Sequence, residues 1–324
     1  ITTPGSLKAY AEAVEDFGTW DWADVVAPAI AQAEDGFKVR PHVHFWWTHG
    51  ASHGRVQIDE RLRFSKTGAE IYFRDDGGVK KIGEHVHNPD IAETLRRIAK
   101  SGPDIFYKGE IAERVAEDMA ANGGLLSYDD LAGYRTTRTD PLRGTYRGHD
   151  IATNQPPGGG VMLLEMLNIL ENFNLGGIGH NTPDYIRTVV EAMKQATVDK
   201  DNFVGDPDFV EIPLEKLLSK EHAAASAQKI RAGEKVHVTR IGQPEPKDTT
   251  HVVVIDAEGN CVTMTHSLGM PSGVITDGLG FMFNGCMAVF DPRPGRAGSI
   301  APGKSRFTSL APTIVSKGGV PRIV

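Results

Sequence analysis

The stretch that decides the fold is Asp248-Thr249-Thr250-His251, followed over residues 252–267 by the run VVVIDAEGNCVTMTHS. Three successive valines and an isoleucine, a turn at residues 258–260 and an alternating run after it predict a β-hairpin whose first strand opens with the threonine pair. Because β-branched residues are enriched in strands, a threonine at a strand mouth usually has no chemical role. The local sequence alone therefore predicts a hairpin and no catalytic residue.

Composition limits the class of protein. The chain has 324 residues, long for one hydrophobic core but feasible as one α/β unit, and its 40% hydrophobic and 24% charged residues are typical of a soluble globular protein. Its 35 basic and 42 acidic residues give a net charge of −7, which argues against a nucleic-acid partner. No apolar run is long enough to span a bilayer, and residues 1–5 do not open a signal peptide. Two cysteines, Cys261 and Cys286, form no disulfide framework or metal motif, and we expect both to be small apolar fillers.

Outside the hairpin, helical periodicity predicts helices within residues 5–36, 91–98, 111–119 and 161–173. Asn88 and Ser127 are placed to cap helices. Residues 220–247 carry scattered Lys and Arg among Gly and Pro, and we expect a surface loop there. The segment that starts at Phe37 is rich in histidines that match no ligand spacing, so we expect polar loop residues and no metal site; they are His42, His44, His49 and His53.

Three glycines, Gly158-Gly159-Gly160, precede the helix predicted over residues 161–173. Glycines at a helix start can cradle an anion. However, neither a P-loop nor a dinucleotide-binding fingerprint accompanies them. We therefore expect the tight backbone to serve close packing.

A series of short motifs runs through the rest of the chain. They are Gly102-Pro103-Asp104, Phe106–Gly109, Gly123-Gly124-Leu125, Asp129-Asp130-Leu131, Tyr146-Arg147-Gly148, Pro156–Gly160, Asn168–Phe173, Glu191–Lys194 and Gly205-Asp206-Pro207. Together with Thr249-Thr250-His251 at a strand mouth, their order resembles the γ-glutamyltranspeptidases, a family of N-terminal nucleophile hydrolases. The resemblance covers nearly the whole chain and implies the four-layer αββα sandwich of that class.

The resemblance also implies roles for particular residues. Thr249 corresponds to the nucleophile that self-cleavage between Asp248 and Thr249 makes the head of a new chain. Its freed α-amine, of near-neutral pKa, then serves as the base for a weakly nucleophilic hydroxyl. Residues 1–248 correspond to the large-subunit part and residues 249–324 to the small-subunit part of one structural domain. We expect sequence to be missing at both ends.

Three further hydroxyl residues match the family's substrate site. Ser267 corresponds to the residue that holds the Thr249 hydroxyl by a hydrogen bond, although a serine at a strand end can equally bond only water. Thr308 and Ser309 correspond to the pair that binds the donor's α-carboxylate, although such pairs are common at turns without a ligand.

The chain departs from the family where a γ-glutamyl donor's ammonium is held. Gly269 replaces an asparagine, and Cys286, Ala288 and Val289 lie where amide and acidic residues are usual. An apolar run leaves a desolvated cation without a counter-charge, which is costly.

The resemblance implies a self-processing amide hydrolase or acyltransferase, nominally for γ-glutamyl transfer or glutathione hydrolysis. An acylase for donors lacking an α-amine and a catalytically silent member with a binding role remain alternatives. The expected partners are a small amide donor, a water or amine acceptor and the two fragments of one precursor, with no metal or organic cofactor. Because the family is often exported, the expected location leans towards the periplasm or the cell exterior.

Overall fold

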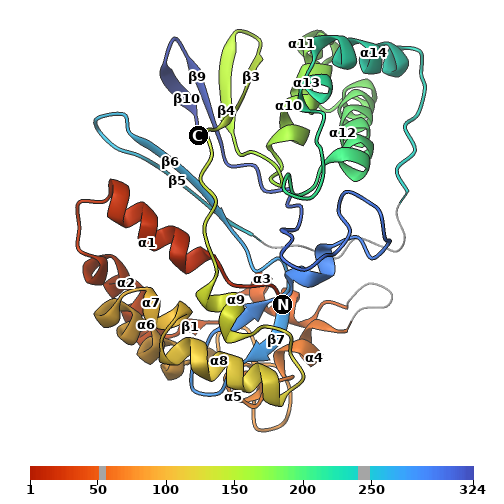
Figure 1. Cartoon of the computed structure of the whole chain (residues 1–324). Helices are drawn as coiled ribbons and strands as arrows, with labels where there is room; N and C mark the ends of the chain where they lie inside the picture. The colour runs from red at the N-terminus through yellow and green to blue at the C-terminus, as the bar shows by residue number, and fades with distance from the viewer. Residues whose placement is uncertain (51–55, 240–248) are drawn as a thin grey trace. The chain divides into compact units, whose positions relative to one another are not determined.

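A computed structural model describes residues 1–50, 56–239 and 249–324 (Figure 1). These residues form two compact units. The first unit contains residues 1–137 and 267–286, and the second contains residues 138–239, 249–266 and 287–324. The predicted boundary at Thr249 does not follow this division, because residues from both sides of it contribute to each unit.

The first unit is mostly helical and carries two short antiparallel strand pairs, β1–β2 and β7–β8. Its elements are α1 (Ser6–Phe17), α2 (Trp22–Asp35), β1 (Phe37–Lys38), α3 (Pro41–Thr48), α4 (Ile58–Leu62), α5 (Lys66–Tyr72), β2 (His85–Val86), α6 (Pro89–Ser101), α7 (Asp104–Tyr107), α8 (Glu110–Ala121), α9 (Tyr128–Ala132), β7 (Pro271–Ile275) and β8 (Met282–Asn284).

The core of the first unit joins its two chain segments. The apolar face of α8 buries Ile111 and Val115, and the later segment adds Leu279 and Phe283 to the same cluster. The Thr94 hydroxyl donates to the Leu279 carbonyl at 2.8 Å in a buried position. Residues 267–286 are thus part of this core.

The predicted helices and caps of this unit are confirmed. The Asn88 side chain accepts from the Ile91 amide at 3.2 Å at the start of α6. Ser127 and Asp130 form a reciprocal capping box on α9. Gly123, at a φ of +70°, follows the end of α8, as expected of a residue without a Cβ.

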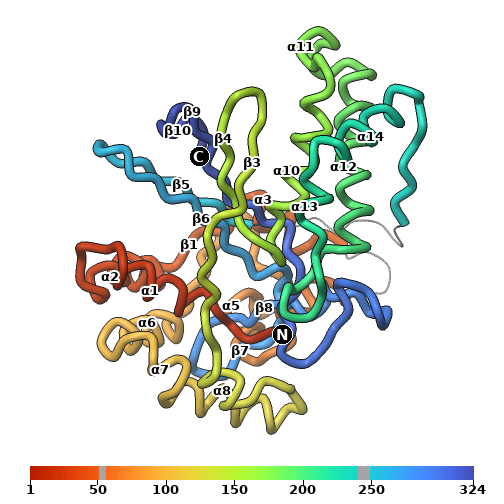
Figure 2. Tube along the Cα trace, turned by 45° about the horizontal axis from the view of Figure 1, so that its top comes forward, coloured from red at the N-terminus to blue at the C-terminus, as the bar shows by residue number. Residues whose placement is uncertain are grey.

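The second unit combines a sheet, a strand pair and a group of helices (Figure 2). Its elements are β3 (Leu142–Tyr146), β4 (His149–Thr153), α10 (Gly160–Glu171), α11 (Leu175–Ile178), α12 (Pro183–Phe203), α13 (Leu214–Leu217), α14 (Lys220–Arg231), β5 (Thr250–Ile255), β6 (Cys261–His266), β9 (Thr313–Lys317) and β10 (Val320–Ile323). A 3₁₀ helix covers Cys286–Val289.

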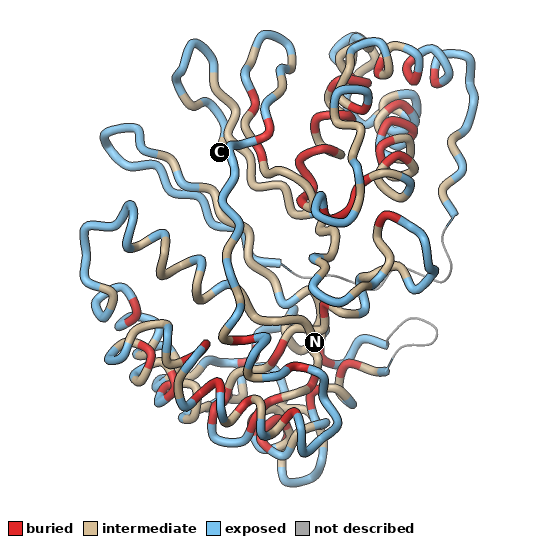
Figure 3. Tube along the Cα trace, in the orientation of Figure 1, coloured by how far each residue is buried: buried red, intermediate tan, exposed pale blue. Residues whose placement is uncertain are grey.

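The sheet has the antiparallel order β10-β9-β4-β3. Strand β4 pairs with β9 from Asp150 opposite Ser316 to Thr153 opposite Thr313. Helix α10 contributes Val161 and Leu164 to the cluster that also contains Ile151 of β4. Helices α12 and α14 pack on α10 through a second cluster. Figure 3 shows the buried parts of these helices in red.

The predicted hairpin is confirmed. Strand β5 pairs with β6 from Thr250 opposite His266 to Ile255 opposite Cys261. At the turn, Gly259 has a φ of +87°, and the Asp256 carboxylate accepts from the amides of Glu258 and Asn260 at 2.9 and 2.8 Å. All six residues of β5 are exposed, which is unusual for so apolar a strand.

The prediction of a loop over residues 220–247 is wrong for its first half, which forms α14. The Ser219 hydroxyl caps this helix by accepting from the His222 amide at 3.0 Å. Its buried residues are Ala223, Ser226, Ala227 and Ile230, which recur at helical spacing. Small alanines give a weak apolar signal beside many charged residues, which explains the error. Residues 240–247 lie outside the described residues.

Two smaller expectations have mixed outcomes. Cys286 is buried as expected, but Cys261 is only half-buried, and both are free thiols. His42 and His44 lie in α3 and not in a loop, and His53 lies outside the described residues. In the part of the chain that the structure describes, no helix is both long and apolar enough to cross a bilayer.

Candidate active site

The proposed nucleophile lies at the open end of the hairpin. Thr249 directly precedes β5 and is exposed, and its neighbour Thr250 forms the last pair of the ladder with His266. Ser267 directly follows β6. Asp248, the other residue of the predicted cut, lies outside the described residues. The exposed position of Thr249 is compatible with the role predicted for it.

Among the residues that the structure describes, His251 is the titratable side chain nearest in sequence to Thr249. Its Nδ1 lies 2.8 Å from the Thr265 hydroxyl and its Nε2 lies 3.3 Å from the Thr263 hydroxyl, both on β6. The donor and acceptor of a neutral imidazole are thus both engaged across the hairpin. His251 is therefore a poor candidate for the base, and the α-amine that cleavage would free on Thr249 remains the better one.

Ser267 makes a local turn. Its Oγ accepts a hydrogen bond from the Gly269 amide at 2.9 Å, and Gly269 has a φ of +68°. This conformation is one that asparagine tolerates better than most residues, so the backbone here is compatible with the family's usual asparagine. An accepting hydroxyl can still donate its proton, which leaves the predicted role of Ser267 towards Thr249 as a prediction. Ser267 belongs to the first unit and Thr249 to the second.

The hydroxyl pair Thr308 and Ser309 lies against the glycine loop that precedes α10. The Thr308 amide donates to the Pro157 carbonyl at 2.9 Å, and the Gly159 amide donates to the Leu310 carbonyl at 2.9 Å. The two backbone segments therefore run side by side, and Ser309 itself is exposed. This geometry presents the pair at the surface of the second unit.

Close approach explains the glycines. A Cβ on Gly159 would lie 2.5 Å from the Ser309 carbonyl oxygen, well inside van der Waals contact. Asn154 fixes the same loop, because its Nδ2 donates to the Leu310 carbonyl at 2.9 Å and its Oδ1 accepts from the Gly160 amide at 3.0 Å. The expectation that this loop serves close packing is confirmed, and its packing partner is the predicted substrate-binding segment.

Sequence reasoning missed the role of Asp206. This buried carboxylate accepts from the Ser305 amide at 2.7 Å and from the Asp208 amide at 3.0 Å. It thus anchors the segment that leads to Thr308. Its place in the Gly205-Asp206-Pro207 motif was a signal, because short acidic side chains in turns commonly bind backbone amides.

The positions that depart from the family provide no free carboxylate that could bind a donor's ammonium group. Cys286 is buried, with its Sγ 3.3 Å from the Leu268 carbonyl, while Ala288 and Val289 are exposed on the 3₁₀ helix. The next carboxylate along the chain, Asp291, forms two hydrogen bonds with the Arg293 guanidinium at 2.9 and 2.6 Å. The bond from Arg293 lowers the pKa of Asp291 to about 2. The Asp291 carboxylate is therefore already paired with a cation, the Arg293 guanidinium.

An α/β fold with a threonine at the mouth of an exposed strand, and a hydroxyl pair held on a glycine loop, is compatible with the fold class of the N-terminal nucleophile hydrolases. A sequence model of the family described as Gamma-glutamyltranspeptidase matches residues 1–324, and the chain belongs to that family. The resemblance found in the sequence is thereby confirmed.

Curated relatives of both kinds considered above match almost the whole chain. The chain is 38% identical to the "Acylase ACY 1 proenzyme" of Pseudomonas sp. (strain SE83) and 32% identical to the "Glutathione hydrolase proenzyme" of Escherichia coli (strain K12). Each match covers 98% of this chain and 56% of the relative. The chain thus spans a little over half the length of these relatives, whose names mark them as precursors.

Solved structures of an acylase and of a γ-glutamyltranspeptidase also match this chain. The cephalosporin acylase from Bacillus halodurans matches 99% of this chain and 58% of its own, with 29% identity and a TM-score of 0.83. The Helicobacter pylori γ-glutamyltranspeptidase matches 73% of this chain and 65% of its own, with 29% identity and a TM-score of 0.64. These likenesses confirm the predicted α/β fold of the N-terminal nucleophile hydrolase type.

Proposed function

We propose that the protein containing this chain is an amide hydrolase or acyltransferase that acts through an ester on Thr249. The observation that carries the proposal is the exposed Thr249 at the mouth of β5, in a chain of this family. The Thr249 hydroxyl would attack the donor's amide carbon while the α-amine takes its proton. That proton would then pass to the leaving amine as the carbon–nitrogen bond breaks. Water or an acceptor amine would next attack the ester and release the acyl group.

Processing would come first. The Thr249 hydroxyl would attack the carbonyl carbon of residue 248, converting the peptide bond into an ester that water then cleaves. This step frees the α-amine that the catalytic cycle needs as its base. It also divides the chain into the predicted parts, residues 1–248 and residues 249–324, and both units contain residues of both parts.

The test is an intact-mass measurement on protein expressed from the complete gene. Wild-type protein should give two fragments with Thr249 at the head of the smaller one, and Thr249→Ala should stay whole. Thr250→Ala is a matched control, because Thr250 is also an exposed threonine at the start of the same strand. A single uncut chain in active wild-type protein would overturn the proposal, and loss of both processing and turnover would favour a silent member.

A second candidate concerns the donor. The side chains of Cys286, Ala288 and Val289, and the pairing of Asp291 with Arg293, favour an acylase for donors that lack an α-amine. The higher identity to an acylase than to a glutathione hydrolase points the same way. The nominal alternative remains γ-glutamyl transfer or glutathione hydrolysis.

A competition between two donors separates these candidates. A missing charge-assisted hydrogen bond to an ammonium is worth about 1.5–3 kcal/mol, or roughly one to two decades in kcat/KM. A glutaryl amide should therefore be cleaved by the processed enzyme with a kcat/KM at least equal to that of the matching γ-glutamyl amide. A strong preference for the γ-glutamyl amide would show that another acidic residue holds the ammonium, and the transpeptidase assignment would stand.

A further inference from the structure

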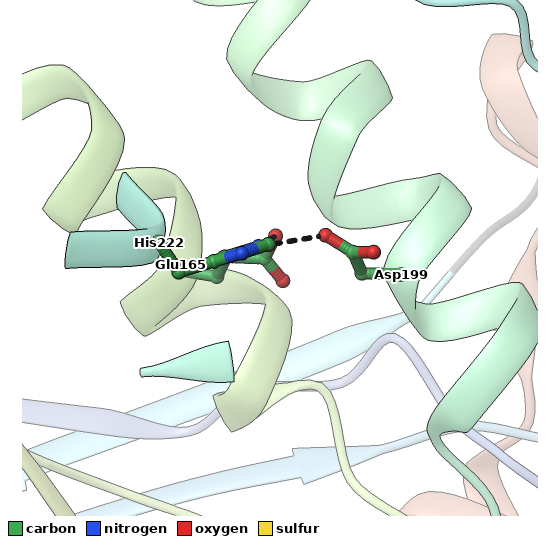
Figure 4. A group of neighbouring side chains, drawn as sticks. All are labelled: Glu165, Asp199 and His222. Carbon is green, nitrogen blue, oxygen red and sulfur yellow. Dashed lines mark hydrogen bonds and ion pairs between the residues drawn. The ribbon is translucent and has the colours of Figure 1, made fainter. Parts of the chain in front are cut away.

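Three titratable side chains meet inside the helical part of the second unit. Glu165 of α10, Asp199 of α12 and His222 of α14 each offer a ligand atom within 4.8 Å of the others (Figure 4). His222 Nε2 lies 3.0 Å from Asp199 Oδ2 and 3.5 Å from Glu165 Oε1. The cluster is separate from Thr249, Thr308 and Ser309, and the proposed reaction does not use it.

The environment of Glu165 makes the cluster more than a group of acids. Only 1% of the Glu165 side chain is exposed, and it lies on a helix that also buries Leu164 and Ile169. Among the described residues, Glu165 Oε1 has no hydrogen-bond partner, since the His222 nitrogen lies at the very limit of bonding distance. An unsatisfied buried polar atom is costly, so this oxygen calls for a ligand.

The two acids of the cluster point the same way. Glu165 and Asp199 bring two buried carboxyl groups together, and a bound cation would offset the cost of placing two carboxylates at this depth. The two lysines close to Asp199 and His222 in the sequence have other partners: Lys200 pairs with Asp201, and Lys220 binds Asn168 and Glu171, both at 2.6 Å.

The spacing of the donor atoms suits a small metal ion. Ligands at about 2.1 Å from a tetrahedral ion lie about 3.4 Å from one another. The separations of 3.0 and 3.5 Å from His222 Nε2 lie on either side of that value, and all three donor atoms lie within 4.8 Å of one another. A mixed set of one imidazole and two carboxylates favours zinc over calcium or magnesium, which prefer oxygen ligands alone.

We propose that Glu165, Asp199 and His222 bind one divalent transition-metal ion, best fitted by Zn²⁺, which ties α10, α12 and α14 together. Neighbouring bonds hold two of the ligands in place. The Gln195 amide donates to Asp199 Oδ2 at 2.7 Å, and the Ser219 cap fixes the first turn of α14, where His222 lies. The ligands are far apart in the sequence, so the ion would cross-link separate helices. Its role would be structural.

The experiment uses protein from the complete gene, freed of any affinity tag, stripped with a chelator and dialysed against ZnCl₂. Wild-type protein should retain one Zn²⁺ per chain and melt at a higher temperature than the stripped form. Glu165→Gln and His222→Gln should each weaken Zn²⁺ binding at least tenfold and abolish that rise. Glu191→Gln is the matched control, because Glu191 is another buried acid of α12, with its own partners Lys194 and Val236.

A second measurement uses wild-type protein alone, so it does not depend on whether a variant folds. Co²⁺ added to stripped wild-type protein should give a visible absorption band that Zn²⁺ abolishes. The absence of that band, or equal Zn²⁺ retention by wild type, Glu165→Gln and His222→Gln, would overturn the proposal. Neither result bears on processing at Thr249, so the two proposals can fail independently.

Discussion

Gly159→Ala tests whether the glycine loop sets the position of the hydroxyl pair. The added Cβ would lie 2.5 Å from the Ser309 carbonyl oxygen and 2.7 Å from its carbon. To reach even the shortest contact that Cβ atoms show, 3.0 Å, the segment carrying Ser309 must move by at least 0.5 Å. Both contact atoms belong to the backbone, so no side-chain rotation relieves the clash.

Two effects of different size follow from this displacement. Overpacking should destabilise the second unit by about 1–3 kcal/mol. The 2.9 Å bond from the Gly159 amide to the Leu310 carbonyl should stretch towards the limit of bonding. If Thr308 and Ser309 bind the donor carboxylate, losing one of those bonds costs about 1.5–3 kcal/mol, which raises KM roughly 10- to 150-fold.

The assay compares urea unfolding and steady-state kinetics of processed Gly159→Ala and wild-type enzyme. Gly176→Ala is the control, because a Cβ at this exposed position of α11 would meet nothing closer than 3.9 Å. The control should keep wild-type KM and match or slightly exceed wild-type stability. Unchanged KM in a correctly folded Gly159→Ala enzyme would refute the role of this segment in donor binding.

Three more substitutions test local arguments. Thr249→Ser should still process but acylate more slowly, because the β-branched threonine has fewer χ1 rotamers; equal single-turnover rates would remove that explanation. Asn284→Ala removes the bonds of the Asn284 amide to the Thr2 amide, hydroxyl and carbonyl, and should cost roughly 1–3 kcal/mol in urea unfolding. Ser127→Ala breaks the capping box with Asp130 and should cost about 0.5–2 kcal/mol, a loss that Ser127→Asn should largely restore.

Elements with a local cause were predictable from the sequence. The hairpin follows from its apolar strands and its turn, and the caps at Asn88 and Ser127 follow from side chains that bond amides three residues away. Helix α14 was missed because three of its four buried residues are small, Ala223, Ser226 and Ala227, and their burial depends on α10 and α12. Its stability comes from packing, which periodicity in a single segment does not reveal.

The candidate active site was predictable only through its resemblance to a family. Nothing local distinguishes Thr249 from any threonine at a strand mouth, and Thr308 with Ser309 is an ordinary hydroxyl pair until the glycine loop is seen against it. The cluster of Glu165, Asp199 and His222 was not foreseen, because its members lie 34 and 23 residues apart on three helices. One signal was available: Glu165 is the only charged residue among the first eleven of α10.

Strands β4 and β9 lie on opposite sides of the predicted cut, yet they pair within one sheet. While the chain is whole, the two strands meet as parts of one molecule, and the rate of folding does not depend on protein concentration. Once the chain is cut, unfolding would separate them, and refolding would require a collision between two molecules. The precursor would therefore have to fold before it cuts itself. A cleaved protein that is unfolded by heat at low concentration would not refold on cooling.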